Sequence, residues 1–113
     1  MPLPHAYDRV VDLPPVLTFE CSAEVWHWRG PAPFHFVSIP EAESEAIREI
    51  ASMVSYGWGM IPAIVTVGGT RFRTAAFAKN GLYALPLKDA VRRAEGIELG
   101  DVVAMTVEVA PKR

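Results

Sequence analysis

Hydrophobic and polar residues alternate along the first regular segment of the chain. From residue 17 to residue 25 the odd positions are apolar and the even positions are polar or charged: Leu17, Phe19, Cys21, Ala23 and Val25 alternate with Thr18, Glu20, Ser22 and Glu24. This period of two predicts a half-buried strand whose odd positions face inward. Trp26 and Trp28 then place two large rings on the polar face, and RGP at 29–31 ends the strand. A second strand, Phe34–Ile39, follows in a hairpin.

A helix with a period of 3.6 residues is expected next. Pro40 stands at the first-turn position where proline is tolerated, and glutamates follow it near the positive end of the helix dipole. One apolar stripe is made by Ile47, Ile50, Ala51 and Val54. The helix ends at Gly57.

The rest of the chain alternates short strands with turn signals. Strands are predicted over Met60–Val67, Thr70–Phe77, Leu82–Leu87 and Val102–Val109, with turns at Gly68-Gly69, Asn80-Gly81 and Gly100-Asp101. A short helix over Lys88–Glu95 ends at Gly96, where a left-handed glycine commonly stops a helix.

One structural unit occurs twice in this pattern. FVSIP (36–40) and LYALP (82–86) are each a short apolar strand ended by proline, and each is followed by a helix, a glycine and another strand. Two such units can pack around a pseudo-two-fold axis and cover each other's apolar faces. We therefore predict an α+β, mainly β fold: a closed six-stranded barrel built from two pseudo-symmetric strand-helix-strand units, with two short helices that cap or flank it. The barrel domain spans 16–110, between a proline-rich N-terminal arm (1–15) and a tail (111–113).

Length and composition fit a single domain in a reducing compartment. The chain has 113 residues, half of them hydrophobic, and a net charge of −2. Residues 1–56 carry three basic and eight acidic side chains, and residues 57–113 carry eight and five, so the C-terminal half is mildly basic. Cys21 is the only cysteine, so no internal disulfide can form, which fits a reducing compartment. Its place in the alternating strand predicts a buried, unreactive thiol. Without a signal-peptide pattern or an apolar run of membrane-span length, we expect a cytoplasmic location and no membrane partner.

Catalytic and metal-binding motifs are absent from the sequence. The three histidines, His5, His27 and His35, are isolated, and no phosphate loop or Gly-x-Ser-x-Gly motif occurs, so neither a metal nor a cofactor is expected. What remains is a set of aromatic and basic side chains that suits a planar anionic ligand at the mouth of a small barrel. The candidate ligand-binding residues are Trp26, Trp28, Trp58, Arg71, Arg73, Tyr83, Lys88 and Arg92.

These residues also have a purely structural interpretation. In that interpretation Trp26 and Trp28 cover a helix on the outer face of the barrel, and Trp58 plugs one end. Arg92 bonds helix carbonyls or pairs with Glu95 or Asp101, and the two arginines of the Thr70–Phe77 strand form its polar face.

Two stretches resemble known families. Residues 85–109 (LPLKDAVRRAEGIELGDVVAMTVEV) resemble the half-barrel unit of the AbrB and MazE transcription-factor superfamily. A wider stretch, from about residue 17 to 109, resembles the bacterial and archaeal family called domain of unknown function 1905. The features that carry this resemblance are Trp28, the strand end at 36–40 with its helix, GWG (57–59), VGGT (67–70), GLYALPL (81–87), VRRA (91–94) and GDVV (100–103). The resemblance implies a closed six-stranded barrel distantly similar to AbrB, and it implies no known activity.

The expected function is binding of a small molecule or peptide through an aromatic and basic mouth, by a monomer or weak homodimer. A rival function is that of an AbrB-like nucleic-acid-binding module, in which Arg71, Arg73, Lys79, Arg92 and Arg93 form a basic stripe. The sequence pI near 5.9 disfavours it, since nucleic-acid-binding domains usually show a clear basic excess. The sequence is also compatible with an enzyme that uses neither a metal nor a covalent nucleophile, and with a pure interaction module.

Overall fold

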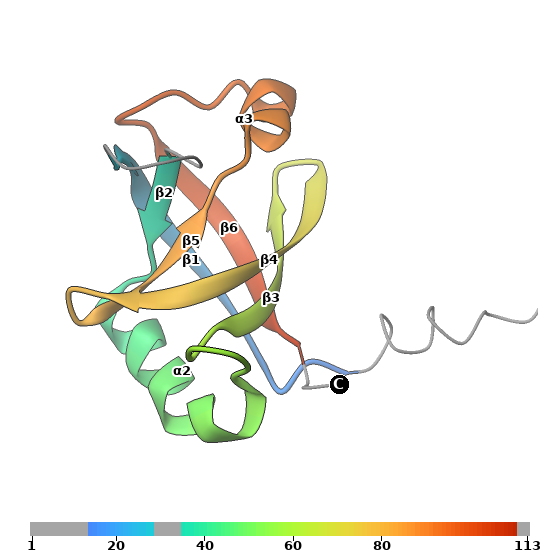
Figure 1. Cartoon of the computed structure of the whole chain (residues 1–113). Helices are drawn as coiled ribbons and strands as arrows, with labels where there is room; N and C mark the ends of the chain where they lie inside the picture. Colours follow the sequence, from blue (N-terminus) through green and yellow to red (C-terminus); the bar gives the residue numbers. More distant parts are fainter. Residues whose placement is uncertain (1–13, 29–34, 111–113) are drawn as a thin grey trace, which may run out of the picture.

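Six antiparallel strands close into a barrel in the computed structural model of the chain, which describes residues 14–28 and 35–110 (Figure 1). The elements are β1 (Leu17–His27), β2 (His35–Ser38), α2 (Glu41–Val54), β3 (Ile61–Val67), β4 (Thr70–Lys79), β5 (Leu82–Pro86), α3 (Asp89–Glu95) and β6 (Val102–Val109). Around the barrel the order is β1-β2-β5-β4-β3-β6. The predicted fold is confirmed. The predicted tail, most of the predicted arm and the start of the second strand at Phe34 lie outside the described residues.

The strand pairings show that the repeat in the sequence is a repeat in the fold. Exchanging β1 with β4, β2 with β5 and β3 with β6 converts every pairing of the barrel into another pairing of the barrel. Ser38 and Ala84 hold the same place in the two repeats and pair with each other across β2 and β5. The pseudo-two-fold axis therefore passes between these two residues.

The two longest strands each bend to serve two neighbours. β1 pairs with β6 as far as Glu24 and with β2 from Val25 onward. In the second unit, β4 pairs with β3 as far as Ala76 and with β5 from Phe77. This second pairing extends β4 to Lys79, two residues beyond the end that alternation alone predicts. Because of this pairing, the outward-facing residues of β4 include Phe77 and Lys79 beyond the bend.

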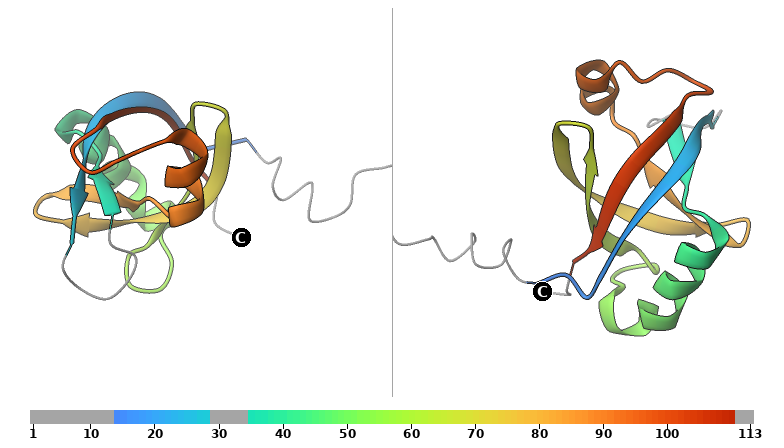
Figure 2. Two further views of the ribbon diagram at one scale, coloured as in Figure 1. Left: turned by 90° about the horizontal axis from the view of Figure 1, so that it is seen from above. Right: turned by 180° about the vertical axis from the view of Figure 1, so that it is seen from behind.

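Apolar side chains fill the barrel interior. The inward side chains of β2, β3, β5 and β6 are buried and form one cluster that α2 joins through its predicted stripe. The fully buried members include Val37, Val65, Leu85 and Val107. Figures 1 and 2 show α2 and α3 at opposite ends of the barrel, in keeping with the pseudo-symmetry. A small barrel filled in this way is a packed core with no open channel.

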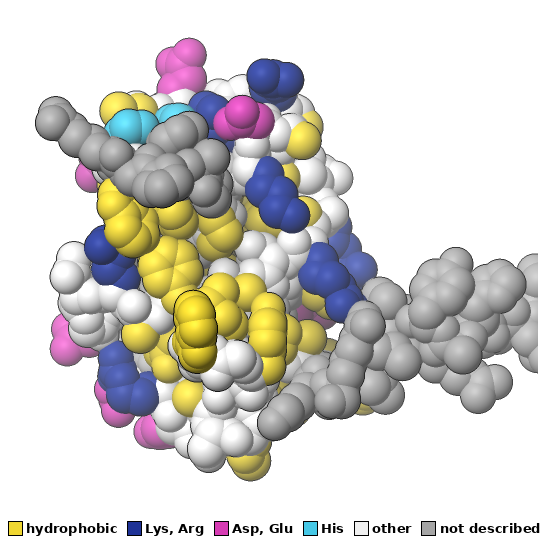
Figure 3. Space-filling model, viewed as in Figure 1, with side chains coloured by type: hydrophobic (Ala, Val, Ile, Leu, Met, Phe, Trp, Pro, Cys, Tyr) yellow, Lys and Arg dark blue, Asp and Glu magenta, His cyan; other side chains and the backbone are white. Residues whose placement is uncertain are grey.

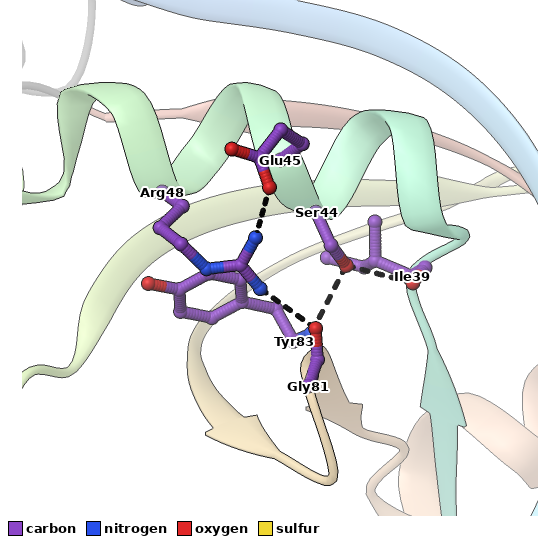
Figure 4. A network of polar contacts seen from close by, with 6 residues as sticks. All are labelled: Ile39, Ser44, Glu45, Arg48, Gly81 and Tyr83. Atoms are coloured by element: carbon purple, nitrogen blue, oxygen red, sulfur yellow. Dashed lines mark hydrogen bonds and ion pairs between the residues drawn. The ribbon is translucent and has the colours of Figure 1, made fainter.

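A buried hydroxyl joins the two halves where β2 leaves the sheet (Figure 4). The Ile39 amide donates to the Tyr83 carbonyl at 2.7 Å, as in a regular ladder. The next ladder position is filled by Ser44 of α2, whose Oγ accepts from the Tyr83 amide at 3.0 Å and donates to the Ile39 carbonyl at 2.8 Å. Since Ser44 is fully buried, no solvent replaces these bonds.

Glu95 fastens α3 to the β3–β4 hairpin on the other side of the molecule. Its Oε2 accepts a hydrogen bond from the Thr70 hydroxyl at 2.5 Å. The same carboxylate occupies the space beside Gly68, where a Cβ would lie 2.0 Å from Oε1. Gly68 also has φ +56°, in the left-handed region that glycine enters without strain. Both constraints meet at this one residue.

Gly68→Ala is therefore expected to lower the free energy of unfolding by about 2 kcal/mol, because the methyl group adds left-handed strain and displaces the Glu95 carboxylate. Gly69→Ala is the matched control, since Gly69 lacks a positive φ and its Cβ would meet nothing within 4 Å. Urea unfolding of both variants measures the difference. Equal stability of the two variants would contradict the role assigned to Gly68.

Candidate functional site

Four aromatic rings pack together on the outer face of the barrel. Trp26 and Phe36 are register partners on β1 and β2, and their rings stack with centroids 5.0 Å apart. Trp28 lies 5.7 Å from Phe36 and 6.3 Å from Phe77 of β4, and the two phenylalanines meet edge to face at 5.6 Å. We call Trp26, Trp28, Phe36 and Phe77 the aromatic cluster. Such ring pairs stabilise one another beyond the area they bury.

The two tryptophans of this cluster have different exposure and partners. The indole Nε1–H of Trp26 donates to Ser38 Oγ at 3.0 Å, so its polar atom is already satisfied. Trp28 is 41% exposed, and the Lys79 ammonium lies 4.0 Å from its ring centroid in a cation–π contact. Trp28 and Lys79 together therefore offer a ligand an aromatic surface and a positive charge at one place.

The outer face of β4 carries three cations. Because Phe72 and Ala76 lie toward the interior, Arg71, Arg73 and Lys79 face outward together with Phe77. Arg71 approaches Glu108 at 3.5 Å, an exposed pair of little energetic weight. Arg73 forms no ion pair with any residue that the structure describes. These three cations therefore form a row along β4, and the row reaches the aromatic cluster at Lys79, which contacts Trp28.

The turn between α2 and β3 displays Trp58. Tyr56 and Met60 exchange both backbone hydrogen bonds at 2.9 Å, which closes a tight turn. Gly57 and Gly59 both have positive φ and let the chain reverse on either side of Trp58. The expectation that Trp58 plugs the barrel end is wrong, because its side chain is fully exposed.

Four of the predicted site residues lie apart from the aromatic cluster, and Trp58, in its exposed turn, is the first of them. Tyr83 points into the core and is only 6% exposed, held there by the pairing of β5 with β2 and β4. Lys88 precedes α3 and Arg92 lies on it. The structure thus brings Trp26, Trp28 and the arginine-bearing strand β4 together. It leaves Trp58, Tyr83, Lys88 and Arg92 outside that group.

Arg92 belongs to a polar group around α3. It bonds Asp89 at 2.7 Å, and this bond together with the guanidinium charge lowers the pKa of Asp89. The buried Nε of Arg92 has no partner within the described residues. His27 and His35 meet edge to face at 5.4 Å, and burial, Arg92 and His27 lower the pKa of His35. The pair between Arg92 and Asp89 replaces the predicted pairing of Arg92 with Glu95 or Asp101.

The single thiol lies on a different face. Cys21 is half-buried and borders a shallow groove of about 450 Å³ beside β6, on the opposite side of the barrel from β5. Desolvation, with the Glu43 carboxylate nearby, raises the pKa of the Cys21 thiol to about 11. Since the thiolate is the nucleophile, the raised pKa disfavours a reactive thiolate at neutral pH. The thiol is half-buried where the sequence predicts it to be buried.

Residues 14–28 and 35–110 contain no group of three or more His, Cys, Asp or Glu side chains placed to hold a metal ion. In the same part of the chain no helix has the length and apolar character that a membrane crossing needs.

Two cluster members are missing from the residues that the sequence predicts for the site. Phe36 sits in a four-residue strand, HFVS, whose two polar residues fall on opposite faces, so alternation does not show which face Phe36 takes. Phe77 stands at the predicted end of its strand. Extending the alternation of Arg71 and Arg73 by four residues places Phe77 on their face, and this is the signal that could have found it.

The family model described as Domain of unknown function (DUF1905) matches residues 22–107. The match covers the barrel from β1 to β6, and with it the aromatic cluster and the Trp58 turn. No curated protein matches the chain. The resemblance of residues 85–109 to AbrB stays a prediction.

Proposed function

Because this chain belongs to the family Domain of unknown function (DUF1905), whose description carries no activity, we propose a function from its surface chemistry: the protein binds a peptide on the aromatic cluster. The observation that supports this most is Trp28, 41% exposed, held against Phe36 and Phe77 with the Lys79 ammonium over its ring. A partly exposed indole on a packed aromatic base is the kind of anchor that dominates binding energies.

The shape of the site favours a peptide over a small molecule. Small-molecule sites are concave and enclose most of their ligand. Here the barrel interior is filled by buried side chains, and the cluster lies on the outside of the strands. An open surface of rings fits the side chains of an extended segment, which needs no enclosing pocket.

The distribution of charge disfavours nucleic acid as the ligand. The three outward cations of β4 occupy one side of the barrel, and much of the rest of the surface is acidic: Glu41, Glu45 and Glu49 are exposed on α2, and Glu20 and Glu24 are exposed on β1, opposite β4. Single-stranded nucleic acid binds to grooves in which positive charge follows the whole backbone. A short peptide makes contact with fewer charges and avoids this conflict.

The test is a thermal-shift screen of the whole chain against a panel of short peptides and metabolites, repeated with Trp28→Ala. A peptide present at 100 times its dissociation constant adds about 2.7 kcal/mol of stability. We expect some peptides to raise the unfolding temperature of the wild-type protein, and we expect this increase to be lost in the Trp28→Ala variant.

Two further variants distinguish a loss of binding from a loss of folding. Lys79→Met retains the apolar stem over Trp28 and removes the charge, and it should weaken the same hits. Leu99→Ala changes an exposed apolar residue of the loop before β6 and should leave them unchanged. Hits that are all metabolites, or that persist in Trp28→Ala, would refute the proposal.

A further inference from the structure

The Trp58 turn continues the aromatic cluster across the barrel. Ile61 of β3 pairs with Ala76 of β4, and both lie inward. Met60 precedes Ile61 and Phe77 follows Ala76, so alternation places both side chains on the outer face at this end of the β3–β4 pair. Figure 3 agrees, because hydrophobic side chains form a band on this face from over β2 and β5 down to the turn between α2 and β3.

We call the combined surface the aromatic strip; its members are Trp26, Trp28, Phe36, Phe77, Met60, Tyr56 and Trp58. One end is anchored at Trp28 and the other at Trp58. Tyr56, two residues before Trp58, is also about half exposed. A contiguous apolar surface of this kind on a folded domain marks an interaction site.

The turn presents Trp58 in a fixed backbone conformation. The two hydrogen bonds between Tyr56 and Met60 close the turn before any partner arrives. A partner that binds Trp58 therefore does not have to order the backbone of this loop, which lowers the entropic cost of binding. Tryptophan is also the residue most enriched among those that carry interface energy.

The charges that flank Phe77 on the outer face of β4 are positive. Arg73 and Lys79 flank Phe77 on the outer face of β4, and Arg73 has no ion-pair partner in the described ranges. Figure 3 shows Lys and Arg side chains on both sides of the hydrophobic band. A ligand that fits this surface carries apolar side chains for the rings and carboxylates for the flanking cations.

From this we propose that the strip binds an extended acidic segment of a partner protein, with one apolar side chain on Trp28, another on Trp58 and carboxylates between them facing Arg73 and Lys79. This rests on the proposed function and adds the partner's chemistry and the second anchor. The segment is extended because it has to reach both ends of the strip, from Trp28 just after β1 to Trp58 in the α2–β3 turn.

The experiment uses the full chain and fluorescein-labelled ten-residue peptides in anisotropy titrations. One peptide has leucines near both ends and aspartates or glutamates between them; a second has lysines in place of the acids; a third has the acids without leucine. We expect the first to bind and the other two to bind at least about tenfold more weakly. Its affinity should also fall as salt is raised from 50 to 500 mM, on the order of several-fold.

Four variants assign the contacts. Trp58→Ala should weaken the first peptide about tenfold or more, and Arg73→Glu about fivefold. Val102→Ala, another highly exposed apolar residue, and Arg93→Glu, an exposed arginine on α3, are the matched controls and should change little. Trp58 and Arg73 are exposed, so both variants should retain the wild-type unfolding temperature.

The outcomes separate this inference from the proposed function. If a peptide binds and depends on Trp28 but not on Trp58 or Arg73, the proposed function stands and the second anchor is wrong. If the lysine peptide binds as well as the acidic one, the partner's chemistry is wrong. If none of the peptides binds at millimolar concentration, or if a ten-nucleotide oligo-dT binds more tightly than all of them, the inference is overturned.

Discussion

Leu85→Ala is expected to lower the free energy of unfolding by about 2–5 kcal/mol, the range for truncating a fully buried leucine. Leu85 has no exposed surface and lies inward on β5, opposite Val37 of β2. That strand pair is where the two halves of the barrel meet, so a cavity there is lined by both halves. Ile39 holds the equivalent place in the first unit and is also fully buried, and Ile39→Ala should cost a similar amount.

Leu99→Ala is the control for this pair, because Leu99 is 59% exposed and its truncation should change stability by no more than about 0.5 kcal/mol. Guanidinium unfolding, monitored by fluorescence, gives the free energies of unfolding of the Leu85→Ala, Ile39→Ala and Leu99→Ala variants. A loss at Leu85 as small as that at Leu99 would mean that β2 and β5 do not pack a shared interior.

Ser44→Ala should cost about 1–3 kcal/mol, although it removes a single oxygen atom. The substitution leaves the Tyr83 amide without its acceptor and the Ile39 carbonyl without the Ser44 donor, at a site closed to water. Hydrogen exchange should accelerate at the Tyr83 amide before it does so at the Ile39 amide, which keeps its bond to the Tyr83 carbonyl.

Ser22→Ala is the matched control on an exposed strand position, and it should be neutral within about 0.5 kcal/mol. Urea unfolding compares the two serines. If the two variants are equally stable and Tyr83 stays protected, the hydroxyl is not what joins α2 to the β2–β5 pair.

The elements and their order could be predicted because most of them carry a clear periodicity. The polar residues of β1 settle which face lies inward, and proline and glycine mark both ends of the two β-α-β units. The repeat then predicts the closed barrel, because two units with apolar faces can bury them only against each other. β6 has the predicted bounds, Val102–Val109.

The candidate site could be predicted only in part. Tyr83 is predicted at the site but lies in the core, since LYALP has no polar residue to show which face turns inward. The structural interpretation makes Trp58 a plug of the barrel end, but the side chain is exposed. Local sequence cannot show that its turn projects outward. Phe77 joins Trp28 only through the bend of β4, which depends on pairing with β5 and hence on contacts far along the chain.

The measurement that tests the account most directly is an NMR titration of ¹⁵N-labelled protein with the leucine-flanked acidic peptide. The central claim, binding on the outer strip from Trp28 to Trp58, predicts that the indole Nε1–H signals of both residues shift together with amides of the second half of β4. The amides of Leu99 and Val102, beside α3 and β6, should stay in place. Shifts confined to β6 or α3, with both indole signals unmoved, would contradict the claim.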